Sequence, residues 1–231
     1  LPLAAGESRS VFFFFSFDAI ADDRVAPLEQ AVVGLDGDSV FASVVARWRR
    51  QLEYSAAEVP AVEGFMQASR TSVAHILLNR DGAAIQPGPR RYARSWIRDG
   101  ATMCAALLRT GNIDAVGEFL AWYAGFLRED GFVPCCVDRE GVDWLVEHDS
   151  HGQWMHAVAE YARFGGDSAP VKMLVKNLLP SVIRAGQYVM ALRASRLTDA
   201  YVSADATPEL VGRRGLIPES VSHEGYLAQP V

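Results

Sequence analysis

Acidic, basic and aromatic side chains that could act on a small polar molecule gather in three stretches of the sequence. The first stretch, residues 86–100, ends in Trp96, Arg98 and Asp99. An indole covers the apolar face of a pyranose ring, while a guanidinium and a carboxylate bind hydroxyl groups directionally. These residues therefore predict a sugar-binding surface. The alternative interpretation is that Asp99 only caps a following helix, where the helix dipole favours a carboxylate.

The second stretch, residues 143–153, places two carboxylates and two imidazoles within five residues, namely Glu147, His148, Asp149 and His151. Such groups suit acid/base chemistry or the binding of sugar hydroxyls. The alternative is a capped helix start at Asp149 or Ser150. Their spacing matches no specific metal site, and neither C-x-x-C nor H-E-x-x-H occurs in the chain, so we predict no metal.

The third stretch, residues 216–226, contains Glu219 and Glu224 on either side of a Ser-x-Ser-His sequence that ends in His223. A serine hydrolase is conceivable, but neither serine lies in the G-x-S-x-G turn that many such enzymes use. A solvated loop is the other interpretation of this stretch. The residues alone leave both open.

The elements that must position these stretches are helices. Apolar periodicity predicts helices at 65–78, 101–109, 113–127, 151–164 and 170–192. Short connections at 110–112 and 165–167 alternate with long ones at 81–100, 128–150 and 194–226. In an array of helical hairpins the short links form one rim and the long loops the other. Because loops of about 20 residues in a compact domain are usually functional, we expect the chemistry on the long-loop rim.

The N-terminal part differs from the rest. Residues 11–17 are mostly phenylalanine and predict a buried strand, and a helix is expected from about residue 39, capped by Asp38 or Ser39. A single strand needs partners, which we expect in sequence upstream of this chain. The predicted organisation is the end of a β-domain at 1–37, a linker helix at 38–60 and a helical domain at 61–231.

Composition narrows the classes of partner. The net charge is −6, and this acidic balance argues against a nucleic acid or an anionic membrane as partner. No run of 18 apolar residues occurs, so no transmembrane helix is predicted. The three cysteines, two of them adjacent, are interpreted as small buried hydrophobic residues rather than a disulfide framework.

Two of the stretches resemble a known family, the six-hairpin glycosidases, which are the (α/α)6 toroids of glucoamylases and trehalases. The first stretch resembles their first signature through the run Pro87-Gly88-x-Arg90 … Trp96-x-Arg98-Asp99. Pro218-Glu219-Ser220 is similar to the Glu-Ser-Gly-Trp-Asp run of trehalases, in the loop that carries their general acid. In this chain Val-Ser-His-Glu replaces Gly-Trp-Asp, so the resemblance implies either Glu219 or Glu224 as the acid.

The resemblance implies a mainly α fold, a partial (α/α)6 toroid over residues 60–230, preceded by the remnant of a β-sandwich as in bacterial members. It implies a glycoside hydrolase that acts on a carbohydrate without a cofactor, with an acid whose pKa is raised by burial or by a second carboxylate. The second catalytic carboxylate would lie in a missing C-terminal half of the polypeptide, so the fragment alone is expected to be inactive. The substrate-binding residues implied or suggested are Trp96, Arg98, Asp99, Glu147, His148, Asp149, His151 and His223.

Two other functions remain open at this point. A sugar isomerase or epimerase on the same toroid would transfer protons through the imidazoles of His148, His151 and His223. A non-catalytic carbohydrate-binding or interaction protein built from helical hairpins would keep Trp96 but not need Glu219 or Glu224.

Overall fold

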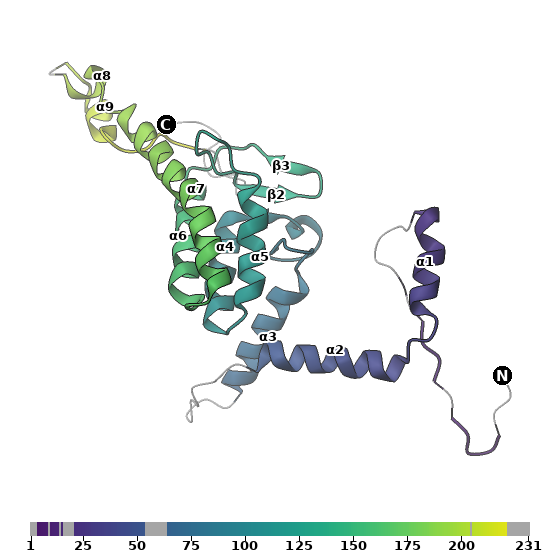
Figure 1. Cartoon of the computed structure of the whole chain (residues 1–231). Helices are drawn as coiled ribbons and strands as arrows, with labels where there is room; N and C mark the ends of the chain where they lie inside the picture. The colour runs from purple at the N-terminus through teal and green to yellow at the C-terminus, as the bar shows by residue number, and fades with distance from the viewer. Residues whose placement is uncertain are drawn as a thin grey trace. The chain divides into compact units, whose positions relative to one another are not determined.

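The computed structural model describes residues 4–8, 10–13, 15, 21–53, 64–203 and 205–220, and it divides the chain into two units, Leu1–Glu53 and Tyr54–Val231. Helices dominate both units, and the second unit adds a small three-stranded sheet (Figure 1). The prediction of a mainly α fold is therefore confirmed. Closure into a toroid stays a prediction.

The first unit contains two helices, α1 (Asp22–Val32) and α2 (Gly37–Leu52). The predicted cap at Asp38 or Ser39 is wrong by two or three residues. The cap is Asp36, whose carboxylate accepts hydrogen bonds from the backbone N–H groups of Asp38 and Ser39 at 3.4 and 3.1 Å. A carboxylate at this position satisfies N–H groups that have no partner within the first turn.

The predicted strand at 11–17 is not observed in the residues of that stretch that the structure describes, 11–13 and 15. A strand is stable only beside other strands that receive its backbone hydrogen bonds, and the described part of the first unit contains none. The assignment of residues 1–37 to a β-domain stays a prediction, and it has to accommodate the helix at Asp22–Val32.

The second unit confirms the five predicted helices within a few residues at each end. Its elements are α3 (Phe65–Leu78), η1 (Arg90–Tyr92), β1 (Ser95–Trp96), α4 (Ile97–Arg109), α5 (Ile113–Ala124), β2 (Cys136–Asp138), β3 (Gly141–Asp143), α6 (Asp149–Phe164), α7 (Ala169–Ala194), α8 (Asp199–Val202) and α9 (Pro208–Arg213). Only three residues connect α4 to α5, and four connect α6 to α7. The long connections before α4 and α6 carry the sheet.

Helices α4 to α7 pack side by side, with α6 in contact with α4, α5 and α7 (Figure 1). The aromatic side chains of Phe119, Tyr123 and Trp154 are fully buried between them. Burial of a side chain of this size contributes about 1.5–3 kcal/mol. The polar atoms of two of these aromatic residues have partners: the Tyr123 hydroxyl donates to the Pro134 carbonyl at 2.9 Å, and Trp154 Nε1 donates to Ser181 Oγ at 3.1 Å.

The antiparallel sheet, in the order β1-β2-β3, joins the first long loop to the second. Trp96 of β1 pairs with Cys136 of β2, and Cys136 pairs in turn with Asp143 of β3. The backbone N–H of Ile97 extends the ladder by donating to the Cys135 carbonyl at 3.0 Å. The strand that precedes α4 and the hairpin that precedes α6 therefore have one common framework.

Within the described residues, no helix combines the length and apolar character needed to cross a membrane. All three cysteines are free and buried, as predicted. Burial raises the pKa of the Cys104 thiol, so this sulfur stays protonated and poorly nucleophilic.

Candidate functional site

Arg98 lies at the centre of the candidate site, between two carboxylates of the second long loop. Its Nη1 atom is 3.1 Å from Glu147 Oε2 and 3.3 Å from Asp149 Oδ2. The Glu147 side chain is 4% exposed, whereas those of Arg98 and Asp149 are 33% and 43% exposed. A buried carboxylate is stable only beside a group of opposite charge, and Arg98 supplies that charge for Glu147. The Arg98 side chain is at the same time partly accessible to solvent.

Backbone packing brings these residues together. Arg98 and Asp149 lie in the first turns of α4 and α6, two helices that pack against each other, and the contact between these two side chains shows that the helix N-termini lie on the same side of the unit. The approach of α5 to α4 depends on Gly100, where a Cβ atom would lie 2.7 Å from Cζ of Phe119. A larger residue at this position would require the buried ring of Phe119 or the helix backbone to shift.

Trp96 and Asp99 flank Arg98 on the same segment. Trp96 is the N-terminal boundary residue of α4, half-buried, with the Tyr92 ring 6.1 Å from its own. Asp99 lies in the first turn and is half-buried, and its side chain makes no cap. The interpretation of Asp99 as the helix cap is therefore wrong, because β1 pairs up to Trp96 and the helix begins directly after it.

His148 and His151 lie in different environments. His148 is nine-tenths buried beside the carboxylates, and burial lowers its pKa although Asp149 acts in the opposite direction. His151 is fully buried, stacked on Tyr188 with 4.6 Å between ring centroids. Both imidazoles are therefore predominantly neutral near pH 7.

The ring nitrogens of His151 are both used within the core. The Val133 backbone N–H donates to Nε2 at 3.3 Å, and Nδ1 lies 3.2 Å from the His148 carbonyl. The tautomer that satisfies both contacts carries its proton on Nδ1. Substrate binding by His151 stays a prediction, which its environment does not favour: the side chain is enclosed by protein, and both ring nitrogens contact the backbone of the second long loop.

The third long loop reaches the same rim. The backbone N–H of His148 donates to Ser220 Oγ at 3.2 Å, across 72 residues of sequence. All three stretches singled out in the sequence therefore meet, as the alternation of short and long connections predicted. His223 and Glu224 lie outside the described residues.

Glu219 has the opposite environment from the one expected of a general acid. Its carboxylate forms an ion pair with Arg196, and Arg213 Nε lies 3.6 Å from its other oxygen. The hydrogen bond from Arg196 lowers the pKa of Glu219, whereas an acid that must hold a proton needs a raised pKa. The expected raised pKa is wrong for Glu219 because its neighbours are guanidinium groups rather than carboxylates.

Among the described residues, no cluster of histidine, cysteine, aspartate or glutamate side chains is arranged to hold a metal ion. The carboxylates nearest the candidate site, Glu147 and Asp149, are oriented by Arg98. The site in its described part is suited to hydrogen bonding of polar groups.

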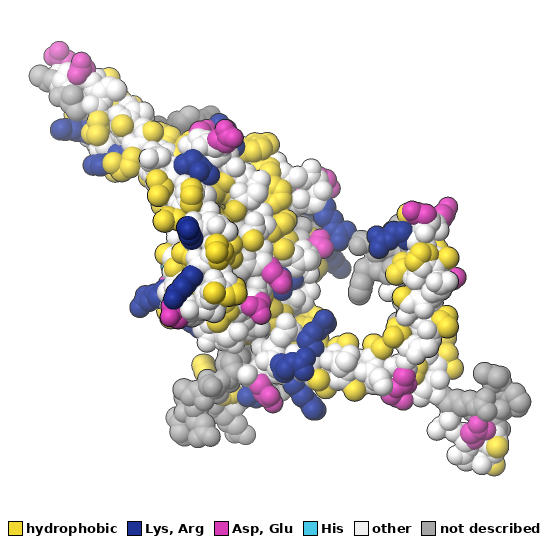
Figure 2. All heavy atoms as spheres, in the orientation of Figure 1, with side chains coloured by type: hydrophobic (Ala, Val, Ile, Leu, Met, Phe, Trp, Pro, Cys, Tyr) yellow, Lys and Arg dark blue, Asp and Glu magenta, His cyan; other side chains and the backbone are white. Residues whose placement is uncertain are grey.

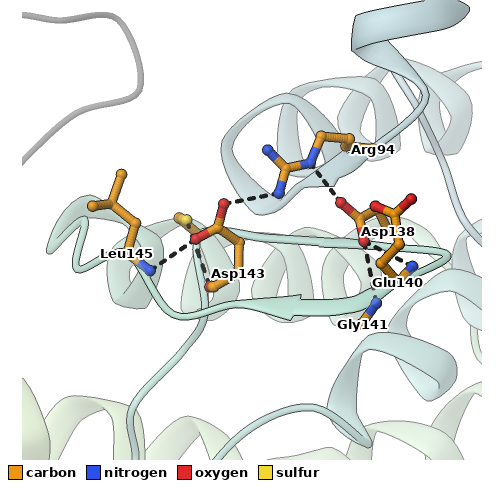
Figure 3. Close-up of polar contacts among 7 residues, drawn as sticks. Arg94, Asp138, Glu140, Gly141, Asp143 and Leu145 are labelled. Atoms are coloured by element: carbon orange, nitrogen blue, oxygen red, sulfur yellow. Dashed lines mark hydrogen bonds and ion pairs between the residues drawn. The ribbon is translucent and has the colours of Figure 1, made fainter.

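Arg94 is not among the site residues predicted from the sequence. Figure 3 shows its guanidinium reaching the β2–β3 hairpin, with Nε 2.8 Å from Asp138 Oδ2 and Nη2 2.8 Å from Asp143 Oδ2. A signal for it exists in the sequence: Arg94 and Trp96 are two residues apart, so in an extended segment both side chains point to one face. Which carboxylates meet that face depends on the pairing of strands distant in sequence.

No known protein-family model matches the sequence, and the comparison with curated proteins found no match. Several solved glycosidases are similar to the chain. A wild-type glycosidase has a TM-score of 0.45 and 21% identity, over 72% of this chain and 45% of the glycosidase. A glycosidase variant in complex with glucose has a TM-score of 0.43 and 21% identity, over 68% of this chain and 43% of its own. The chain thus spans less than half the length of these glycosidases.

Proposed function

We propose that this chain is the sugar-binding part of a glycoside hydrolase. The observation that carries the proposal is the ion-paired Arg98, one-third exposed, between Glu147 and Asp149 at the point where three long loops meet. The half-buried indole of Trp96 lies two residues away in sequence. This combination of an aromatic surface with oriented charged groups suits a molecule with one apolar face and a rim of hydroxyls.

In this proposal Trp96 packs against one face of a pyranose, and Arg98 and Asp99 bind its hydroxyl groups. Glu147 holds the Arg98 guanidinium in place from the protein interior, since a buried carboxylate keeps its cationic partner close. Asp149 is more exposed and can accept a hydrogen bond from the sugar directly. The neutral imidazole of His148 can either donate or accept, depending on its tautomer.

Hydrolysis of a glycosidic bond requires one protonated carboxyl that expels the leaving oxygen and one carboxylate that activates water or attacks the sugar. We propose Glu224 as the acid, because the arginines around Glu219 favour its ionised form. Glu219 then has a structural role, linking its loop to Arg196 near the end of α7.

We further propose that the partner carboxylate belongs to a second half of the same polypeptide, which would complete an (α/α)6 toroid with this chain. The exposed apolar side chains on α7 support this proposal, since monomeric proteins rarely leave extended apolar patches in water. Hydrolytic activity would then require both halves, while sugar binding would depend largely on this one.

The histidine-based isomerase is less well supported by the described residues. His151 is enclosed in the core and has both nitrogens engaged, so it cannot transfer a proton to or from a bound sugar. A non-catalytic sugar-binding protein would use the same Trp96 and Arg98 contacts, and it becomes the better description if an extended polypeptide binds sugars without cleaving glycosides.

The test is a titration of the chain with glucose, galactose and mannose, followed by calorimetry and by tryptophan fluorescence. We expect at least one of them to bind with a Kd of about 1 mM, and the change Trp96→Ala to weaken that binding about tenfold. The matched control is Trp144→Ala, which removes an exposed indole from the second long loop. Absence of binding of all three sugars up to about 0.1 M would contradict the proposal.

A further inference from the structure

Arg94 bridges the two strands of the β2–β3 hairpin through the carboxylates of Asp138 and Asp143. Backbone N–H groups of the hairpin and of the segment after it orient both carboxylates. Oδ1 of Asp138 accepts hydrogen bonds from the backbone N–H groups of Glu140 and Gly141 at 3.0 and 3.1 Å, which leaves Oδ2 for Arg94 (Figure 3). This arrangement closes the hairpin turn and fixes the carboxylate. The Asp138 carboxylate is therefore held in position independently of Arg94, and formation of the ion pair does not have to restrict its side chain further.

The second carboxylate connects Arg94 to the segment that leads into the candidate site. Oδ1 of Asp143 accepts from the Leu145 backbone N–H at 3.0 Å, while Oδ2 accepts from Arg94 at 2.8 Å. Glu147, the buried partner of Arg98, follows Leu145 by two residues. Movement of Arg94 would thus be transmitted to the start of the segment that presents Glu147.

Arg94 also contacts Trp96, the residue proposed to pack against the sugar ring. Its Cζ atom lies 5.5 Å from the centroid of the Trp96 ring, within the range of a cation–π contact. The side chain is 27% exposed, and the side chains of Asp138 and Asp143 are 14% and 25% exposed, so water screens these ion pairs only in part. The planar fork of an arginine makes both bridges at once, and a lysine ammonium cannot reproduce that geometry.

We infer that Arg94 is a positioning residue, which sets the placement of Trp96 relative to the Arg98–Glu147 pair by tying both to the β2–β3 hairpin. The inference rests on the proposed function, since it gives Arg94 the task of aligning two groups that bind one sugar. Arg94 itself does not contact the sugar. Displacement of binding groups by about 1 Å is enough to lower binding and rate strongly.

The test uses the whole chain labelled with 5-fluorotryptophan, which yields one fluorine resonance for each of its five tryptophans. The Trp96→Phe variant identifies the Trp96 resonance. In Arg94→Lys we expect the solvent isotope shift of that resonance to increase, and binding of glucose, galactose or mannose to weaken about tenfold. The melting temperature should fall by only a few degrees, because the lysine keeps one ion pair.

The control is Arg139→Lys, which alters an ion pair of the same hairpin, between Arg139 Nε and Asp81 Oδ2 at 2.8 Å. This variant should leave the Trp96 resonance and sugar binding unchanged. If Arg94→Lys lowers the melting temperature but leaves the Trp96 resonance and sugar affinity as in the wild type, Arg94 only stabilises the hairpin and the inference is wrong. A wild-type chain that binds no sugar contradicts the proposed function instead, and the fluorine spectra then still decide whether Arg94 positions Trp96.

Discussion

Arg98 and Glu147 are 49 residues apart in the sequence, and their side chains meet at 3.1 Å between Nη1 and Oε2. Glu147 is almost completely buried, whereas Arg98 is partly open to solvent. One residue thus anchors the pair within the protein, and the other presents a charge at the surface. The pair is therefore both a structural contact between two loops and the proposed binding site for sugar hydroxyls.

This double role predicts two effects of Arg98→Ala. Removal of the guanidinium takes the Arg98 ion pair away from the buried carboxylate of Glu147, which should lower the free energy of unfolding by about 2–3 kcal/mol. Sugar binding should be lost as well. Denaturant unfolding and calorimetric titration measure the two effects.

The matched control is Arg109→Ala at the opposite end of α4, where Arg109 Nη2 lies 2.7 Å from an oxygen of the poorly exposed Glu160. We expect this variant to lose stability while binding sugar as the wild type does. Equal loss of sugar binding in both variants would show that binding follows stability alone, and the role of Arg98 would have to be abandoned.

Glu219 predicts a pH dependence of stability. The hydrogen bond from Arg196 lowers the folded-state pKa of Glu219 below its ordinary value of 4.5. The stabilisation is therefore fully present above about pH 5 and is lost as the pH falls through the folded-state pKa, because the unfolded chain binds the proton first. Thermal unfolding between about pH 6 and pH 3 should show a smaller acid-induced decrease in Glu219→Gln than in the wild type.

A double-mutant cycle isolates this contribution. Once Arg196→Ala has removed the guanidinium, the further change Glu219→Gln should alter the acid sensitivity little. An undiminished effect of Glu219→Gln in that background would mean that another group lowers the pKa of Glu219.

The choice between Glu219 and Glu224 as the acid predicts different substrate dependence, to be measured on the polypeptide extended by the proposed second half. Loss of the acid should slow cleavage of substrates with poor leaving groups about 10²–10⁴-fold and spare activated aryl glycosides, whose leaving group departs without a proton. We expect this selectivity for Glu224→Gln and not for Glu219→Gln. If neither variant shows it, the acid is a different residue.

From the exposed apolar side chains of helix α7 we predict that the isolated chain binds the dye ANS. Leu179, Ile183 and Met190 are each about half exposed or more on the side of α7 opposite the buried Leu178 and Ala185. Hydrophobic side chains gather over this helix in the view of Figure 2. An exposed apolar surface of this kind binds ANS and favours aggregation.

The double variant Leu179→Ser/Ile183→Ser should bind less ANS than the wild type and unfold at nearly the same temperature, because neither side chain is buried. Lys176→Ser on the same helix is the control and should leave ANS fluorescence unchanged. A wild-type chain that remains monomeric, binds no ANS and hydrolyses glycosides would contradict both this prediction and the proposed need for a second half.

Local sequence patterns determined the positions of the helices and of the long loops between them. The spacing of apolar residues predicted the helix at Phe65–Leu78 with its observed limits, because the period of a helix depends only on residues close together in the sequence. The alternation of short and long connections likewise predicted that the loops 81–100, 128–150 and 194–226 gather on one side, and contacts of Arg98 with Glu147 and of His148 with Ser220 join them. Both inferences need only the order of elements along the chain.

Tertiary packing decided what each side chain does. His151 and His148 look equivalent in the sequence, yet the approach of Val133 and Tyr188 makes His151 a core residue. The sequence makes Glu219 a candidate acid, but the structure pairs it with Arg196, 23 residues away. Burial and charge pairing depend on residues that are distant in sequence and close in space, and these contacts exist only once the helices have packed.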